Sequence, residues 1–119
     1  RTMLPVAMAW ARRRYKIYEA DATAARVEVA AALDRIQAEL RPSGYLVGVS
    51  FSVADLTAAA LLYPLVNPPE YQYRLPQPPD RLQSWMDSFA GHPAVAWIGE
   101  MWRRHRGRSA EVGAAVAAQ

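Results

Sequence analysis

The chain has 119 residues, of which 52% are hydrophobic and 21% are charged, and its formal net charge is +3 at pH 7. These are the proportions of a folded globular chain, and the length suits one domain and not two. The chain contains no cysteine, which excludes disulfide scaffolds, thiolate zinc sites, iron–sulfur clusters and cysteine nucleophiles. No apolar run approaches the roughly 18 residues of a membrane-spanning helix, so we expect no membrane partner.

The compartment and the source can also be anticipated from the sequence. Arginine and alanine are abundant and lysine is nearly absent, which is typical of a GC-rich bacterial genome. Basic residues follow the apolar segment 3–11, whereas in a signal peptide they precede it. We therefore expect a cytoplasmic bacterial protein.

Two amphipathic helices are predicted in the first part of the chain, over about residues 2–19 and 22–41. Their apolar residues recur at spacings of three and four, which places them on one helical face. In the first helix this face comprises Leu4, Met8, Ala11, Tyr15 and Tyr18, and in the second Val29, Leu33, Ile36 and Leu40. Pro42, Ser43 and Gly44 end the second helix.

The start of a third helix is the strongest local signal in the chain. Ser52 and Asp55 have the spacing of a capping box, and Phe51 and Leu56 have the spacing of a hydrophobic staple. The residues that follow, as far as Tyr63, are almost all apolar, which predicts a buried central helix. The cap explains Asp55 better than a catalytic role does.

The rest of the chain predicts a proline-rich loop over residues 67–80 and two further helices. Asp80 is the expected N-cap of the first of these, Gly91 its C-terminal stop, and Pro93 the start of the last helix. The last helix has a face of Ala94, Ile98, Met101, Trp102 and His105, where His105 is expected to bond the final carbonyl groups. The prediction is an all-α bundle of about five helices.

Two stretches of this sequence resemble a known family. The run Gly44 to Leu56 (GYLVGVSFSVADL) resembles the signature of the C-terminal domain of cytosolic glutathione transferases, in which Leu-x-Gly precedes Ser/Thr-x-x-Asp-Leu. The run Leu82 to Val95 (LQSWMDSFAGHPAV) is similar to the next helix of that domain and the turn after it. Val49 departs from the pattern, because the family often has Asp or Asn after the glycine.

The resemblance implies a domain organisation. Residues 1–107 would form the helical C-terminal domain and residues 108–119 a flexible tail. The N-terminal thioredoxin-like domain, which binds glutathione and activates its thiol, has no counterpart in this sequence. Glutathione would therefore be the co-substrate of a longer parent, and this chain alone would be inactive, with no cofactor and no catalytic residue of its own.

The resemblance also implies a place for the second substrate, a small hydrophobic electrophile. The pocket would be lined by residues of the first and last helices: Trp10, Arg14, Tyr15 and Trp102. The alternative is that the aromatic residues are core or interdomain packing, which is commoner at helical spacing. In the family the first two helices contribute to a dimer contact, so a homodimer is a further expectation.

Other functional classes receive less support. The basic run Arg103 to Arg108 suits the negative end of a helix better than nucleic acid, because it lacks interleaved aromatic residues. Two histidines with no clustered carboxylates make no metal site. Two alternatives to the enzyme stay open: a non-enzymatic interaction module built on the same helical domain, and a free-standing helical binding domain.

Overall fold

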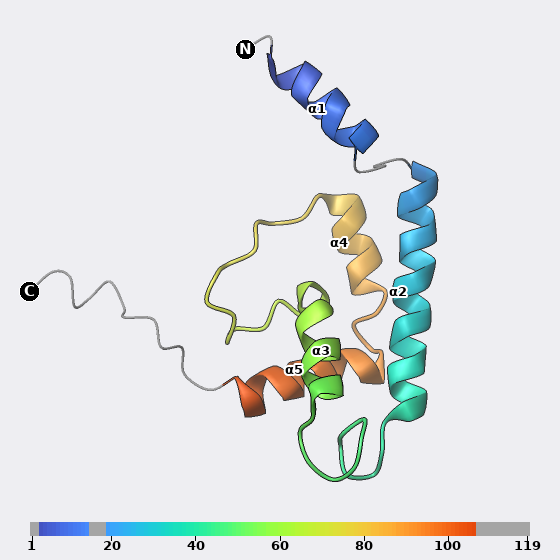
Figure 1. Cartoon of the computed structure of the whole chain (residues 1–119), viewed down its shortest axis with the longest axis vertical. Helices are drawn as coiled ribbons and strands as arrows, with labels where there is room; N and C mark the ends of the chain where they lie inside the picture. Colours follow the sequence, from blue (N-terminus) through green and yellow to red (C-terminus); the bar gives the residue numbers. More distant parts are fainter. Residues whose placement is uncertain (1–2, 15–18, 107–119) are drawn as a thin grey trace, which may run out of the picture. The chain divides into compact units, whose positions relative to one another are not determined.

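A computed structural model describes residues 3–14 and 19–106, which are helical or loop and include no strand (Figure 1). The helices are α1 (Met3–Arg14), α2 (Glu19–Glu39), α3 (Val53–Leu61), the short 3₁₀-helix η1 (Tyr63–Leu65), α4 (Asp80–Asp87) and α5 (Pro93–His105). The predicted all-α fold with five α-helices is confirmed. The chain forms two compact units, Arg1–Arg35 and Ile36–Gln119, which are described separately.

The first unit contains α1 and most of α2. No residue of α1 is buried, and Met3, Leu4 and Trp10 expose 83%, 69% and 64% of their surface. Trp10 therefore does not belong to a core within this unit, and its interpretation as an interdomain packing residue stays a prediction. In α2, Leu33 is fully buried, as its position in the apolar stripe predicts. The predicted tail and the predicted face residues Tyr15 and Tyr18 lie outside the described residues.

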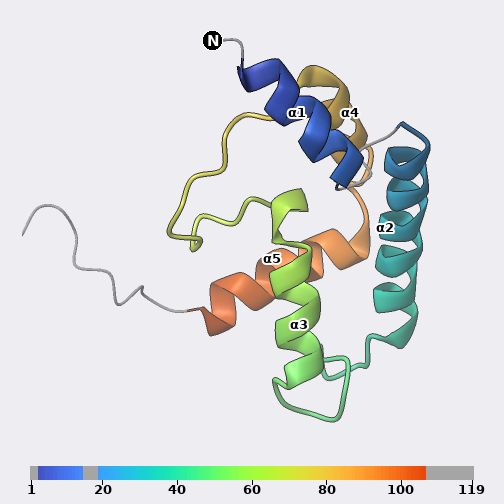
Figure 2. The ribbon, with the colours of Figure 1, turned by 45° about the horizontal axis from the view of Figure 1, so that its top comes forward.

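The second unit has a core centred on α5. The buried residues of α5 lie on one side of the helix, because they recur at three- and four-residue spacings: Ala94, Trp97, Ile98 and Met101. Figures 1 and 2 both show α3 lying across α5, and the two helices are in contact. Ile36, Tyr45, Ala59 and Pro68 are also buried in this unit.

Helix α3 begins where the sequence predicts but is not buried on all sides. Ser52 is its N-cap, and the helix ends before Pro64, which sits in η1. Only Asp55 and Ala59 are buried, whereas Val53 and Leu61 are 77% and 73% exposed. The expectation of full burial is wrong, because within this unit α3 packs on one side, against α5 and η1.

The connector between α2 and α3 depends on glycine at two positions. Gly44 and Gly48 have φ values of 85° and 65°, a left-handed conformation that costs glycine little. The turn is tied to α5, because the indole nitrogen Nε1 of Trp97 donates a hydrogen bond of 2.9 Å to the carbonyl oxygen of Gly44. This contact fixes the connector against α5.

The boundaries of α4 and α5 differ in detail from the predictions. The N-cap of α4 is Pro79 instead of Asp80, because the carbonyl oxygen of Pro79 accepts the first helical hydrogen bonds. The helix ends at the C-cap Ser88, before Gly91. Helix α5 starts at Pro93 as predicted, and its N-cap is His92, whose Nδ1 accepts a hydrogen bond from Ala94 N–H at 3.1 Å. None of the described helices combines the length and apolarity that crossing a bilayer requires.

Candidate ligand-binding site

A small pocket opens between α3 and α5, with a volume of about 240 Å³. Its lining comes from the N-terminal flank of α3, from α3 itself and from the C-terminal half of α5: Phe51, Leu56, Ala59, Ala60, Met101, Trp102, His105 and Arg106. Six of these eight side chains are apolar, and the two polar ones are His105 and Arg106. The pocket thus has apolar walls and its polar groups come from the end of α5.

Trp102 is held in a fixed orientation in this pocket. Its Nε1–H donates a hydrogen bond of 3.0 Å to the carbonyl oxygen of Ala59 in α3. Its ring also meets two tyrosines of the chain that follows α3, Tyr63 at 5.9 Å and Tyr71 at 5.8 Å between ring centroids. An indole that is anchored at its nitrogen and packed against two aromatic rings presents a preorganised aromatic surface.

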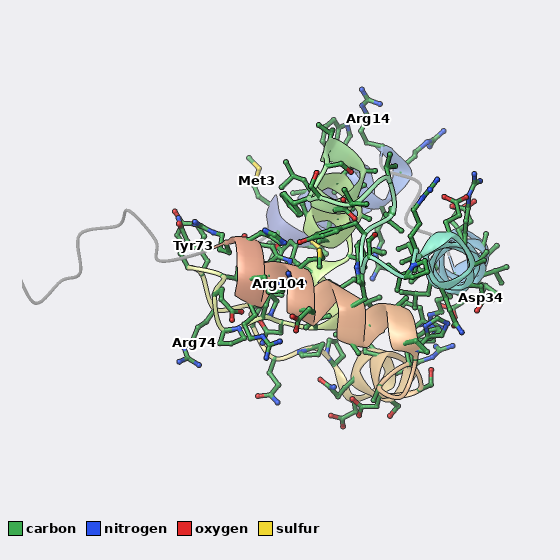
Figure 3. All side chains as sticks on the ribbon, turned by 90° about the horizontal axis from the view of Figure 1, so that it is seen from below. Met3, Arg14, Asp34, Tyr73, Arg74 and Arg104 are labelled. Atoms are coloured by element: carbon green, nitrogen blue, oxygen red, sulfur yellow. The ribbon has the colours of Figure 1, made fainter. Side chains whose placement is uncertain are left out.

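The two tyrosines also contact each other. Their ring centroids lie 4.4 Å apart, and their hydroxyl oxygens lie 3.3 Å apart, within hydrogen-bond distance. The hydrogen bond with Tyr63, together with burial, raises the pKa of Tyr71 above its usual value. The loop over residues 67–79 is therefore joined to α5 by aromatic packing, with Tyr73 and Arg74 reaching outward from it (Figure 3).

His105 lies at the edge of the pocket and does not cap its own helix. Its ring stacks on Phe51 with centroids 4.1 Å apart. Its Nε2 lies 3.3 Å from the Tyr45 hydroxyl, within hydrogen-bond distance. The prediction that His105 bonds the last carbonyl groups of α5 is therefore replaced by two contacts with the connector that precedes α3.

The arginines of the last turn of α5 have different partners. Arg103 forms an ion pair with Glu100, and the Nε of Arg104 lies 3.8 Å from the same carboxylate. The Arg104 guanidinium also lies over the Tyr45 ring, with its central carbon 5.7 Å from the centroid. Arg106 lines the pocket and donates to the amide oxygen of Gln72 at 3.3 Å. Among the described residues, no carboxylate forms an ion pair with Arg106.

Asp55 has a structural role beside the pocket and is not one of the residues that line it. Its side chain is fully buried and accepts hydrogen bonds from Leu46 N–H at 2.8 Å, Ser52 N–H at 2.8 Å and the Ser52 hydroxyl at 2.7 Å. Burial alone would raise the pKa of this carboxyl. The hydrogen bonds from Leu46 and Ser52 outweigh burial and hold the pKa below its usual value. Asp55 thereby fixes both the connector and the first turn of α3.

The four residues that the resemblance places in a substrate pocket are distributed over the two units. Trp102 lines the pocket of the second unit. Trp10 and Arg14 lie on α1 in the first unit, both exposed, and Figure 3 shows the Arg14 side chain extending away from the ribbon. Tyr15 lies outside the described residues. Of the three that the structure describes, Trp102 lines the α3–α5 pocket, and the substrate-binding role of all four stays a prediction.

Sequence reasoning missed several pocket residues. Phe51 and Leu56 were expected to staple the helix start, and they also line the pocket. Met101 was expected only as part of an apolar face, and Arg106 only as one of several terminal cations. No local sequence signal distinguishes Arg106 from Arg103, because the two differ only in their partners. Arg103 pairs with Glu100, whereas Arg106 bonds to Gln72 of the 67–79 loop.

Comparison with known proteins identifies the family. The family model described as "Glutathione S-transferase, C-terminal domain" matches residues 8–88, which include α3 and end before α5. No curated protein and no solved structure matches the chain. The match covers more than half of the 119 residues and agrees with the five-helix fold and the capped start of α3. The chain belongs to the glutathione S-transferase C-terminal domain family.

Proposed function

We propose that this chain is the electrophile-binding part of a glutathione transferase. In the reaction, the sulfur of the glutathione thiolate would attack an electrophilic carbon, forming a C–S bond while a leaving group departs with its electron pair. The observation that supports this role is the apolar pocket between α3 and α5, in a chain that belongs to the transferase C-terminal domain family.

The size of the pocket suits a small aromatic molecule. An apolar protein cavity of roughly 150 Å³ accepts benzene, and this pocket has about 240 Å³. It is smaller than the roughly 300–1,000 Å³ typical of drug-sized ligands. A ligand of one or two rings would contact the Trp102 indole and the Leu56 and Met101 side chains. Such a ligand would be bound mainly by burial of apolar surface.

The glutathione site would come from a thioredoxin-like domain outside this sequence. Activating a thiol requires a donor or a cation that stabilises the thiolate next to a site for the peptide. The pocket described here offers apolar walls and no set of peptide-binding groups. The proposal therefore assigns electrophile binding to this chain and thiol activation to its partner domain, with cytoplasmic homodimers as the expected form of the whole enzyme.

The proposal can be tested by filling the pocket. Ala60 lines it from an exposed position on α3, so Ala60→Trp would occupy the space without disturbing the core. Ala54→Trp adds the same side chain at an exposed position of α3 that does not line the pocket, and serves as the matched control. Saturation-transfer NMR with 1-chloro-2,4-dinitrobenzene should show binding to the original chain and to Ala54→Trp, but not to Ala60→Trp. Equal binding by all three would contradict the pocket assignment.

A non-enzymatic interaction module is the second candidate. The observation that favours it is the exposure of apolar side chains on α3 and just before it: Val49, Val53 and Leu61 expose 85%, 77% and 73% of their surface. Exposed apolar patches often mark protein contacts. Glutathione binding by the full-length gene product distinguishes the two candidates. An enzyme would bind glutathione, whereas an interaction module would not require it.

A further inference from the structure

We infer that the α3–α5 pocket prefers aromatic ligands that carry a negative charge, with Arg106 as the residue that selects them. The inference rests on the proposed function only in using the same pocket, and it specifies the chemical class of the ligand. It also depends on residues of α5 that lie beyond the part of the chain matched by the family model, residues 8–88.

The first observation is that no carboxylate of residues 3–14 and 19–106 forms an ion pair with Arg106. Glu100 pairs with Arg103 and lies 3.8 Å from Arg104, so these two arginines share one carboxylate. Arg106 contacts only a neutral group in the described part of the chain, the amide of Gln72. Its guanidinium has several N–H donors, and one hydrogen bond to Gln72 leaves others for a ligand.

The second observation is the position of this cation relative to the apolar walls. Arg106, the C-cap residue of α5, lines the pocket together with Met101 and Trp102, which precede it by five and four residues. A ligand whose ring lies on the indole would therefore have its edge close to the guanidinium. Because a guanidinium matches a carboxylate or sulfonate with two parallel hydrogen bonds, an anionic substituent at that edge is recognised by both geometry and charge.

Gln72 acts as a positioning residue for this contact. It lies in the loop that Tyr71 attaches to Trp102, and its Oε1 accepts from Arg106 at 3.3 Å. The amide restrains a long flexible side chain without neutralising its charge, which lowers the entropic cost of holding Arg106 at the pocket. The partial negative charge at the C-terminus of α5 disfavours binding of an anion. The preference for anionic ligands therefore depends on the Arg106 side chain and should disappear when that side chain is replaced.

The test compares two ligands of similar shape, 2-naphthoate and the neutral 2-acetylnaphthalene, by calorimetry on the full 119-residue chain at low salt. We expect 2-naphthoate to bind about tenfold more tightly. Arg106→Gln should remove this preference and leave the affinity for 2-acetylnaphthalene unchanged. Arg103→Gln is the matched control, since it removes a charge from the same turn that Glu100 already pairs, and it should retain the preference.

The possible failures are distinguishable. Equal affinity of the original chain for both ligands, or a preference that survives Arg106→Gln, would overturn the selectivity while leaving the pocket intact. If neither ligand binds, both the selectivity and the proposed pocket are wrong. If both bind and Ala60→Trp blocks neither, the ligands occupy another site, which also overturns the inference. A preference that Arg103→Gln removes to the same extent would indicate general electrostatic attraction instead of Arg106.

Discussion

Asp55 shows how a local sequence signal and a long-range contact meet in one side chain. Its pairing with Ser52 is visible in the sequence, because a capping box depends on residues only three apart. Its hydrogen bond from Leu46 N–H is not visible there, because it depends on how the connector folds back over nine residues. The buried carboxylate therefore both caps the start of α3 and joins the connector to this helix.

Replacing Asp55 by Ala should destabilise the chain by about 2–3 kcal/mol. Loss of a cap alone costs roughly 0.5–2 kcal/mol, and leaving the Leu46 N–H without its acceptor adds to that cost, by about 1 kcal/mol or more. Urea denaturation followed by circular dichroism measures the difference. Thr57→Ala, at an exposed position on the same helix, is the control and should change stability little. A loss no larger than the control's would contradict the assigned role of Asp55.

The lowered pKa of Asp55 predicts a specific acid sensitivity. The folded carboxyl binds its proton only at a lower pH than the unfolded one, so protonation favours unfolding. Its contribution is therefore fully present above the unfolded pKa of about 4 and is lost as the pH falls through the lowered folded pKa. Melting temperatures measured from pH 6 to pH 2 should fall less steeply for Asp55→Asn than for the original chain. Parallel curves would show that the carboxyl titrates alike in both states.

At the scale of elements, the sequence predicted the features that are set locally and missed those set by tertiary contacts. The start of α3, its end before Pro64 and the start of α5 at Pro93 follow from caps and from proline geometry. The burial of α3 was overestimated, because an apolar composition does not say how many neighbours a helix has. The α4 helix ends at Asp87 even though a glycine suitable for a helix stop lies further on.

The candidate site was predictable only in part for the same reason. Periodicity placed Trp102 on one face of α5 with Ile98 and Met101, but it did not reveal its partner Ala59, which is 43 residues away. His105 and Tyr45 are 60 residues apart, and no sequence motif around either residue predicts their contact. Contacts across such distances depend on how helices cross, which no local pattern in a single sequence specifies.

The connector offers a prediction at this scale. Gly44 has a φ of 85° and open space around its Cα, so Gly44→Ala should cost about 1 kcal/mol from backbone strain alone. Gly91 has equally open surroundings without a left-handed φ, so Gly91→Ala should be neutral or stabilise the chain slightly. The two urea midpoints separate conformational strain from the loss of a glycine as such. Equal midpoints would contradict the strained conformation at Gly44.

At the scale of the whole molecule, each unit exposes apolar side chains that folded domains usually cover. Met3 and Leu4 on α1 are 83% and 69% exposed, and Val49 beside α3 is 85% exposed. Surfaces of this kind are typical of contacts with other domains or subunits. The proposed division of labour gives them a role, because a thiol-activating domain and a second subunit would both need surfaces on which to dock.

The central claim is that this chain supplies a substrate pocket and that glutathione binds elsewhere in the full-length gene product. The most direct test is a calorimetric titration of glutathione into the 119-residue chain and into the full-length product under the same conditions. The account predicts binding by the full-length product and none by the chain. Binding of glutathione by the chain itself, or by neither protein at millimolar glutathione, would contradict it.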